Sequence, residues 1–193
     1  MSLILASKSE IRRTMLAQAG LDFSVLAPDF DEDLVKERHQ GTSEKLASRL
    51  AEGKAMSLNA GPDVWVIGSD SIISVDGVRY SKPRDRDEAA AHLRGFSGRT
   101  MFLSSAVALA RNGRIDWRHA ETARLEVRPL SENFIRSYLD AEWPGVSYCV
   151  GVFRMEGRGV TLFDRVDGSH FTILGMPLLP LLAALRQRGL APS

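Results

Sequence analysis

Short apolar runs and stretches with helical spacing alternate along the chain. The apolar runs predict strands at Leu3–Ala6, Phe23–Ala27 and Val64–Gly68, the first and last of them buried. Apolar residues recur every three or four positions from Ser9 to Ala19 and again from Ser43, which is the pattern of an amphipathic helix. Between them, residues 28–33 are rich in carboxylates and predict an acidic loop. The first part of the chain therefore predicts strand, helix, strand, loop, helix and strand.

Two hairpin signals and three helical segments follow. Asp76-Gly77 separates runs 72–75 and 78–80, and Asn112-Gly113 separates runs 99–110 and 114–127; both dipeptides favour two-residue turns. Helices are expected at 87–96, 131–140 and 177–187, a strand at 160–166, and irregular chain at 145–159. Because strands and helices are mixed throughout, we predict an α/β protein with a largely mixed sheet. The 193 residues suit a single domain over 1–193.

Composition narrows the function classes. The chain is 44% hydrophobic and 25% charged, which excludes wholesale disorder. Its 25 basic and 24 acidic residues nearly cancel, so we expect no nucleic-acid partner. The one cysteine, Cys149, excludes an intramolecular disulfide and a multi-cysteine zinc site. No signal peptide and no run of about 20 apolar residues is visible, so we expect a soluble, cytoplasmic protein without a membrane partner.

A basic cluster follows the first predicted strand. Ser7, Lys8, Ser9, Arg12 and Arg13 lie where the strand turns into a helix. Hydroxyl groups, cations and the free N–H groups of a helix N-terminus can together hold a polyphosphate. An ordinary helix start with solvated cations would show the same residues, and from spacing alone it is the more frequent case.

Carboxylates form the second group of candidates. Asp70 follows an apolar run at what we expect to be the carboxyl end of a strand, where ligands bind in open α/β sheets. It could bind Mg²⁺ or take a proton from water, or it could be a turn aspartate. Asp29, Asp31, Glu32 and Asp33 repel one another unless a cation lies among them. A solvated acidic loop explains most of these four, and one of them could be a ligand.

Two lysines complete the candidates. Lys54 lies in a helical stretch rich in alanine and leucine, and Lys82 precedes Pro83, which favours an extended backbone. Either could be an ordinary surface lysine. The four histidines show no metal-binding spacing.

Eight short motifs occur in a fixed order along nearly the whole chain. They are A-S-K-S-E-I-R-R at 6–13, D-F-D-E at 29–32, L-A-E-G-K-A at 50–55, I-G-S-D at 67–70, S-K-P at 81–83, S-G-R-T at 97–100, E-G-R-G-V-T-L-F at 156–163 and I-L-G-M-P-L at 173–178. Each is weak alone, but the ordered set resembles the Maf family of nucleoside triphosphate pyrophosphatases. The resemblance implies a Maf/ITPase-like α/β sandwich with an elongated mixed sheet and a nucleotide cleft between two lobes.

The resemblance also implies an activity and a set of site residues. The activity is hydrolysis between the α- and β-phosphates of a nucleoside triphosphate, with Mg²⁺ or Mn²⁺ as cofactor, in the removal of non-standard nucleotides. Asp70 falls on the catalytic aspartate, and Asp70 and Glu32 are the expected metal ligands. The expected substrate-binding residues are Ser7, Arg12, Arg13, Lys54, Ser71, Lys82 and Glu156. A homodimer is the arrangement often found in the family, although no apolar stripe demands one here.

Three positions depart from the family pattern, and a fourth, Glu156, bears on the base. Glu10 replaces the usual proline, Ile11 replaces Arg or Trp, and Ser71 replaces Thr or Gln. Glu156 matches the 7-methyl-GTP branch, whereas the pyrimidine branch has Gln. A carboxylate accepts two hydrogen bonds, which suits the N1–H and N2–H₂ edge of guanine, while uracil and thymine offer one N–H flanked by carbonyl oxygens that it repels. We therefore expect a guanine-type or modified-purine substrate, although Ile11 cannot stack on a cationic base as Trp would.

An alternative of another class stays open. The family is also linked to cell-division arrest, so the chain could be a nucleotide-binding regulator without catalysis. Such a regulator would keep Arg12, Lys54 and Lys82 but would not need Asp70. The presence of Asp70 together with Lys82 favours the enzyme.

Overall fold

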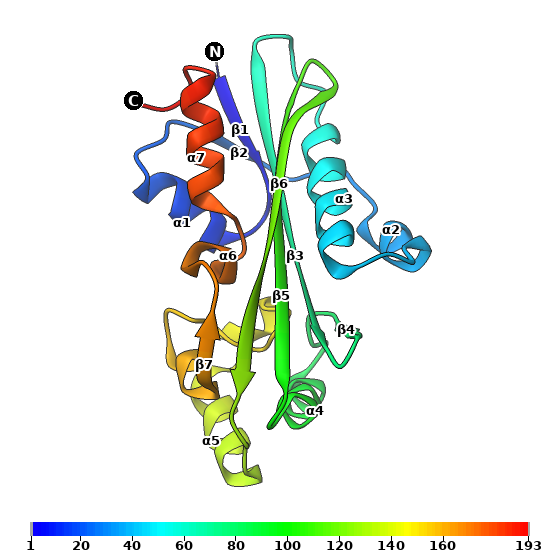
Figure 1. The fold of residues 1–193 in the computed structure, drawn as a ribbon, viewed down its shortest axis with the longest axis vertical. Helices are drawn as coiled ribbons and strands as arrows, with labels where there is room; N and C mark the ends of the chain where they lie inside the picture. Colours follow the sequence, from blue (N-terminus) through cyan, green and yellow to red (C-terminus); the bar gives the residue numbers. More distant parts are fainter. Residues whose placement is uncertain (1, 193) are drawn as a thin grey trace. The chain divides into compact units, whose positions relative to one another are not determined.

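The computed structural model describes residues 2–192 (Figure 1). The strands are β1 Ser2–Ala6, β2 Ser24–Leu26, β3 Val64–Val75, β4 Val78–Tyr80, β5 Thr100–Arg111, β6 Arg114–Val127 and β7 Phe163–Asp167. The helices are α1 Glu10–Gln18, α2 Glu32–Arg38, α3 Ser43–Met56, α4 Arg86–Phe96, α5 Glu132–Glu142, α6 His170–Leu174 and α7 Leu178–Gln187. Short 3₁₀ helices cover Gly145–Tyr148 and Arg158–Leu162.

The strands form a mixed sheet, as predicted. Their order is β2-β1-β3-β5-β6-β7, with β4 paired to β3. β1 runs parallel to both β2 and β3, whereas β3 with β4 and β6 with β7 are antiparallel. Opposite Leu5 of β1 stands Ile67 of β3, and opposite Ala6 stands Gly68. This register brings the polar chain after β1 beside the polar segment of β3.

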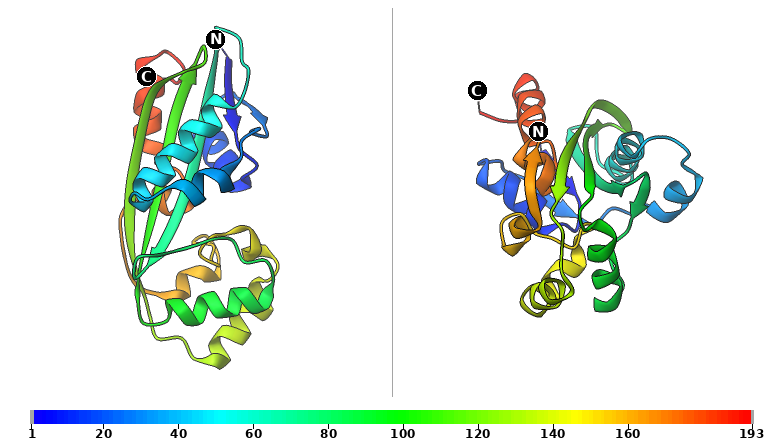
Figure 2. Two further views of the ribbon diagram at one scale, coloured as in Figure 1. Left: turned by 90° about the vertical axis from the view of Figure 1, so that its right-hand side faces the viewer. Right: turned by 60° about the horizontal axis from the view of Figure 1, so that its bottom comes forward.

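The chain divides into two compact units, which are described separately. The first unit comprises residues 2–71, Ser104–Glu121 and 169–192. In it, α1 and α7 cover one face of the strands and α3 covers the other (Figures 1 and 2). Leu16, Ile67, Leu109 and Leu181 are fully buried in the core on the α1 and α7 side. Side chains alternate along the part of β3 that lies in this unit, residues 64–71, so its odd-numbered positions face α1 and α7 and its even-numbered positions face α3.

The second unit comprises Ile72–Leu103 and Thr122–Gly168. It contains the tight hairpin at Asp76-Gly77, whose two φ angles of 50° and 80° are those of the predicted two-residue turn. α4 and α5 lie together there, joined by an ion pair between Arg94 and Glu132. Leu93 and Ile135 are buried on their inner faces.

Three local predictions were wrong, and one short helix was not predicted. Residues 28–33 are not all loop, because α2 begins at Glu32, capped by Asp31, which accepts from the backbone N–H of Leu34 at 3.1 Å. β3 does not end at Asp70 but continues to Val75, so Asp70 is not a turn residue. The strand expected at 160–166 begins only at Phe163, and the short helix α6 was not foreseen.

Among the described residues, no helix has the length and apolar character needed to span a membrane.

Candidate functional site

An ammonium group joins two carboxylates in the first unit. Lys54 Nζ lies 2.8 Å from Asp70 Oδ1 and 2.9 Å from Glu32 Oε1. The side chains of Lys54 and Asp70 are only 7% and 11% exposed, and that of Glu32 is 34% exposed. Burying charged groups is unfavourable unless they are paired, so this triad is a built feature of the fold. We call Glu32, Lys54 and Asp70 the charge triad.

Close backbone packing places the triad. Gly68 precedes Asp70 by two positions and faces the same side of β3. A Cβ on Gly68 would lie 2.1 Å from the carbonyl oxygen of Ala51 and 2.5 Å from the backbone N of Ala55 in α3. Only a glycine lets α3 approach this closely, and the approach brings Lys54, which precedes Ala55, onto Asp70.

A second close contact brings in Glu32. A Cβ on Gly53 of α3 would lie 2.1 Å from the Cζ atom of Phe30. The ring of Phe30 therefore packs directly on the α3 backbone, and α2 begins two residues later. The motifs at 29–32, 50–55 and 67–70 are thus joined in space by two glycine contacts and one lysine.

Lys36 extends the cluster and was missed by the sequence analysis. Its Nζ lies 3.3 Å from Glu32 Oε2 and 3.4 Å from Asp33 Oδ1. The i,i+4 spacing of Glu32 and Lys36 is the signal that could have found it. Partial burial opposes ionisation of Glu32, but the charges and hydrogen bonds of Lys54 and Lys36 outweigh it and lower the pKa of Glu32. Glu32 is therefore a carboxylate at neutral pH.

Arg12 lies on the other face of β3 from the charge triad. Its Nε donates to the carbonyl of Gly175 at 2.9 Å, Nη1 to the carbonyl of Ser69 at 3.0 Å, and Nη2 to Ser71 Oγ at 3.1 Å. Ser71 Oγ also lies 2.8 Å from Ser105 Oγ. Burial lowers the pKa of the Arg12 guanidinium, and the nearby charges of Asp70 and Glu32 offset this only in part. Arg12 thus ties α1 to β3 and to the end of α6.

The remaining basic and hydroxyl candidates of the first unit surround the start of α1. Ser7 is buried directly after β1, and its Oγ accepts from the backbone N–H of Ser9 at 3.1 Å. Arg13 is exposed and paired with Glu10 on the same helix. Glu10 thus complements the helix N-terminus and the cation of Arg13 at once.

Two predicted substrate residues belong to the second unit. Lys82 is exposed in the segment between β4 and α4, and Glu156 is exposed in the segment before the second 3₁₀ helix. Arg154 lies near enough to Glu156 for their charges to interact, but its guanidinium is bonded to Glu142, with Nη2 donating to Oε2 at 2.8 Å.

Metal binding can be examined from the donor atoms. Within residues 2–192, no group of three or more His, Cys, Asp or Glu side chains is arranged to hold an ion by itself. Glu32 and Asp70 nevertheless converge on a single cation, the ammonium of Lys54. Two carboxylates are a usual protein contribution to an Mg²⁺ site completed by substrate phosphates and water. The donor set therefore fits a metal that arrives with a nucleotide.

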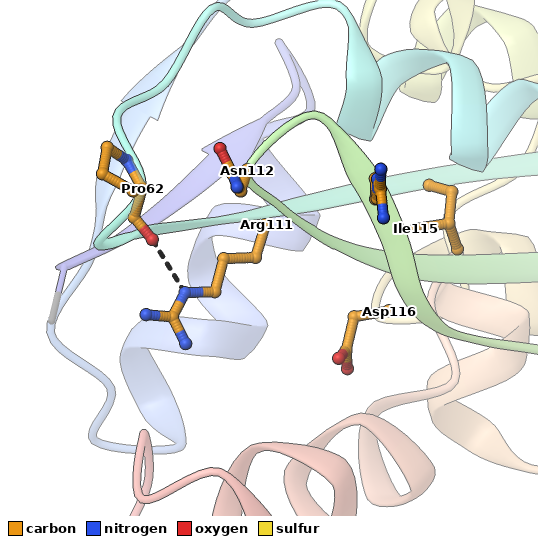
Figure 3. A pocket seen from close by; sticks show the side chains of 6 residues that line it. Pro62, Arg111, Asn112, Ile115 and Asp116 are labelled. Atoms are coloured by element: carbon orange, nitrogen blue, oxygen red, sulfur yellow. Dashed lines mark hydrogen bonds between the residues drawn. The ribbon is translucent and has the colours of Figure 1, made fainter.

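A separate open hollow lies at the β5–β6 turn of the first unit (Figure 3). It is lined by Pro62, Arg111, Asn112, Arg114, Ile115 and Asp116. Arg111 Nε donates to the carbonyl of Pro62 at 2.8 Å across one side of it. None of the predicted site residues lines this hollow.

Comparisons with known proteins agree with the motifs. A family model described as Maf-like protein matches residues 2–188. A nucleoside triphosphate pyrophosphatase of Nitrobacter winogradskyi is 46% identical over 191 residues, covering 97% of this chain and 94% of that protein. A 7-methyl-GTP pyrophosphatase of Rhizobium meliloti is 44% identical over 191 residues, covering 97% and 96%. Among solved structures, the Staphylococcus aureus Ham1 protein matches with a TM-score of 0.46 and 18% identity over 66% of this chain and 72% of that chain. The predicted family is thereby confirmed: this chain belongs to the Maf family.

Proposed function

We propose that this protein is a nucleoside triphosphate pyrophosphatase that hydrolyses the bond between the α- and β-phosphates, releasing a nucleoside monophosphate and pyrophosphate. The observation that carries the proposal is the charge triad, in which a buried lysine and two carboxylates meet. Relatives that are 44–46% identical over nearly the full chain carry the names nucleoside triphosphate pyrophosphatase and 7-methyl-GTP pyrophosphatase. The cellular role that fits is removal of non-standard nucleotides in the cytoplasm.

Asp70 is the proposed proton acceptor. Hydrolysis needs a water aimed at the α-phosphorus and a group that takes its proton as the attack develops. Asp70 Oδ1 is fixed by Lys54 at 2.8 Å, which orients the carboxylate on a rigid strand. The ammonium of Lys54 also supplies positive charge for the phosphates, whose negative charge must be offset before pyrophosphate can leave.

Glu32 and Asp70 are the proposed ligands of a divalent cation, Mg²⁺ or Mn²⁺. When bound, the cation neutralises phosphate charge and polarises the oxygens that it contacts. Lys36 pairs with the second oxygen of Glu32 and with Asp33, so three carboxylates meet two ammonium groups in this part of the protein. A bound nucleotide would add negative charge to this group of residues, and its divalent cation would add positive charge.

The other substrate contacts are proposals of the same kind. Ser7 and Arg13 flank the start of α1, whose free N–H groups favour phosphate. Lys82 would contribute a further cation, and Glu156 would accept the N1–H and N2–H₂ groups of a guanine-type base. Arg12 and Ser71 are included with them; the bonds of Arg12 within the protein leave part of its guanidinium for substrate, since arginine has five N–H donors.

The test is product analysis with a panel of GTP, 7-methyl-GTP, UTP, dTTP, CTP and ATP in the presence of Mg²⁺ or Mn²⁺. The wild type is expected to form monophosphate and pyrophosphate in equal amounts, with the guanine members preferred. Asp70→Asn should lower kcat by about 10²–10⁴-fold. Asp76→Asn, in the exposed β3–β4 turn, is the matched control and should leave kcat unchanged. A folded protein that binds nucleotide but releases no pyrophosphate would replace this proposal with the non-catalytic cell-division regulator.

A further inference from the structure

The segment that carries Glu156 is held in shape from one face of α5. We propose that Glu142 and Tyr138 of α5 are positioning residues for base selection, and that they act on Glu156 through the turn on which it stands. The inference rests on the proposed function, because it takes Glu156 as the residue that reads the base. All the contacts that carry it lie within the second unit.

Glu156 occupies a closed turn. The backbone N–H of Gly157 donates to the carbonyl of Arg154 at 3.1 Å, so the turn runs from Arg154 to Gly157 with Glu156 at its third position. Glu156 itself is exposed. The direction of its carboxylate is therefore set by where the two ends of this turn are held.

Glu142 holds the first residue of the turn. Its Oε2 accepts from Arg154 Nε at 3.2 Å and from Nη2 at 2.8 Å, and Gly157 at the other end lies beside the same oxygen at van der Waals distance. The Glu142 side chain is 6% exposed, whereas that of Arg154 is 42% exposed. The buried carboxylate of Glu142 therefore fixes Arg154, and with it the first residue of the turn, to α5.

The backbone of Arg154 is confined from the other side as well. A Cβ on Gly159 would lie 2.4 Å from the carbonyl oxygen of Arg154 and 2.7 Å from its N. The segment after the turn therefore folds back against its first residue. With Glu142 on one side and Gly159 on the other, Arg154 has little freedom to move.

Tyr138 holds the chain just before the turn. It precedes Glu142 by one helical turn, and its hydroxyl donates to the carbonyl of Val152 at 2.9 Å. Val152 is fully buried with φ at +56°, a backbone conformation that is a genuine outlier for a β-branched residue. Such strain persists only where surrounding contacts hold it, and it clusters at ligand sites. Burial raises the pKa of the Tyr138 hydroxyl, which stays protonated and able to donate.

Glu142 and Tyr138 stand one helical turn apart on α5, and both direct their polar atoms at the segment that leads into the turn. A base that hydrogen-bonds the Glu156 carboxylate would lose that bond if the turn moved by about 1 Å. A uracil-type base depends less on the position of this carboxylate, because its single N3–H is flanked by carbonyl oxygens that a carboxylate repels.

The experiment compares kcat/KM for GTP, 7-methyl-GTP and UTP in the wild type, Glu142→Gln and Tyr138→Phe, with melting temperatures measured in parallel. The control is Glu132→Gln, because Glu132 lies on the same helix and also accepts two hydrogen bonds from an arginine, Arg94, at 2.7 and 2.9 Å, away from the turn. We expect Glu142→Gln and Tyr138→Phe to lower the ratio of guanine to uracil turnover by about 10-fold or more. Glu132→Gln should leave the ratio unchanged. In Glu156→Gln, adding Glu142→Gln should produce no further loss of the ratio.

The outcomes separate the inference from the function on which it rests. Equal loss for all three nucleotides in Glu142→Gln and Tyr138→Phe, or an unchanged ratio, overturns the positioning role while turnover by the wild type upholds the proposed function. Absence of triphosphate turnover by the wild type overturns both. If Glu142→Gln does not fold, Tyr138→Phe decides, since it removes a single hydroxyl from the same anchoring face.

Discussion

Replacing Lys54 by methionine tests whether the charge triad is built as described. Methionine keeps much of the length of the side chain but removes the ammonium that joins Asp70 and Glu32. Asp70, whose side chain is 11% exposed, is then left as a buried charge without its partner.

The magnitude follows from burial. Removing one partner of a buried ion pair costs about 3–5 kcal/mol. Glu32 is a third exposed and keeps Lys36, so its share is small and the lower part of the range, about 3 kcal/mol, applies. For a chain of this size that corresponds to a fall in Tm of roughly 6–12 °C.

The assay is thermal unfolding at pH 7, with Lys45→Met as the control. Lys45 is an exposed lysine on the same helix α3, so its replacement should change stability by less than about 0.5 kcal/mol. Adding Asp70→Asn to Lys54→Met should recover part of the loss, because it removes the unpaired charge. Equal melting temperatures for Lys54→Met and Lys45→Met would refute the buried pairing.

Three further predictions follow from the same contacts. Gly68→Ala should destabilise the protein by about 1–3 kcal/mol and lower activity, because its Cβ would press α3 and Lys54 away from β3. Gly61→Ala, with no atom within 4 Å of its Cβ, should do neither. Urea unfolding measures the stability and pyrophosphate release measures the activity of each variant. Arg12→Lys should cost about 2–4 kcal/mol by leaving buried carbonyl groups without donors, with the exposed neighbour Arg13→Lys close to neutral in the same unfolding assay. The pKa of Glu32 is lowered in the folded state, so the stability that its ionisation contributes is present above the ordinary carboxyl pKa of about 4.5 and is lost as the pH falls through the lower folded value. Glu32→Gln should therefore flatten the fall of Tm at acid pH. An unchanged fall would contradict the pairing of Glu32 with the lysines.

Local patterns predicted most elements of the fold. Apolar runs and helical spacing located β1, α1 and α3, and the Asp-Gly and Asn-Gly dipeptides located both hairpins. These features depend on neighbouring residues alone. The shape of β3 could not be predicted in this way, because Ser69 and Asp70 look like a strand end until their long-range partners are known.

Long-range partners explain why β3 continues past Ser69 and Asp70. Ser69 Oγ donates to the carbonyl of Ala106 at 2.7 Å, and Asp70 is neutralised by Lys54. Each contact joins residues far apart in sequence, so no window along the chain contains it. The helix α2 had local signals, an Asp31 cap and basic residues in its last turn, but the run of carboxylates resembles a solvated loop equally well.

The candidate site was predicted by residue type more than by geometry. Asp70, Lys54 and Glu32 were singled out separately, and the structure brings these three together. Arg12 was expected to face phosphates with them, yet it lies across β3 in bonds to Ser69, Ser71 and Gly175. The spacing of Arg12 within α1 gives no information on which face of another strand it meets, and its substrate role stays a prediction.

The most direct test is the rate at which the wild type and Asp70→Asn convert GTP and 7-methyl-GTP to monophosphate and pyrophosphate under saturating Mg²⁺. If Asp70 is the proton acceptor, the wild type forms monophosphate and pyrophosphate in equal amounts, and the rate falls by about 10²–10⁴-fold in Asp70→Asn with nucleotide binding retained. Near-normal turnover by folded Asp70→Asn, or a nucleoside diphosphate and inorganic phosphate as the products, would contradict the proposed mechanism.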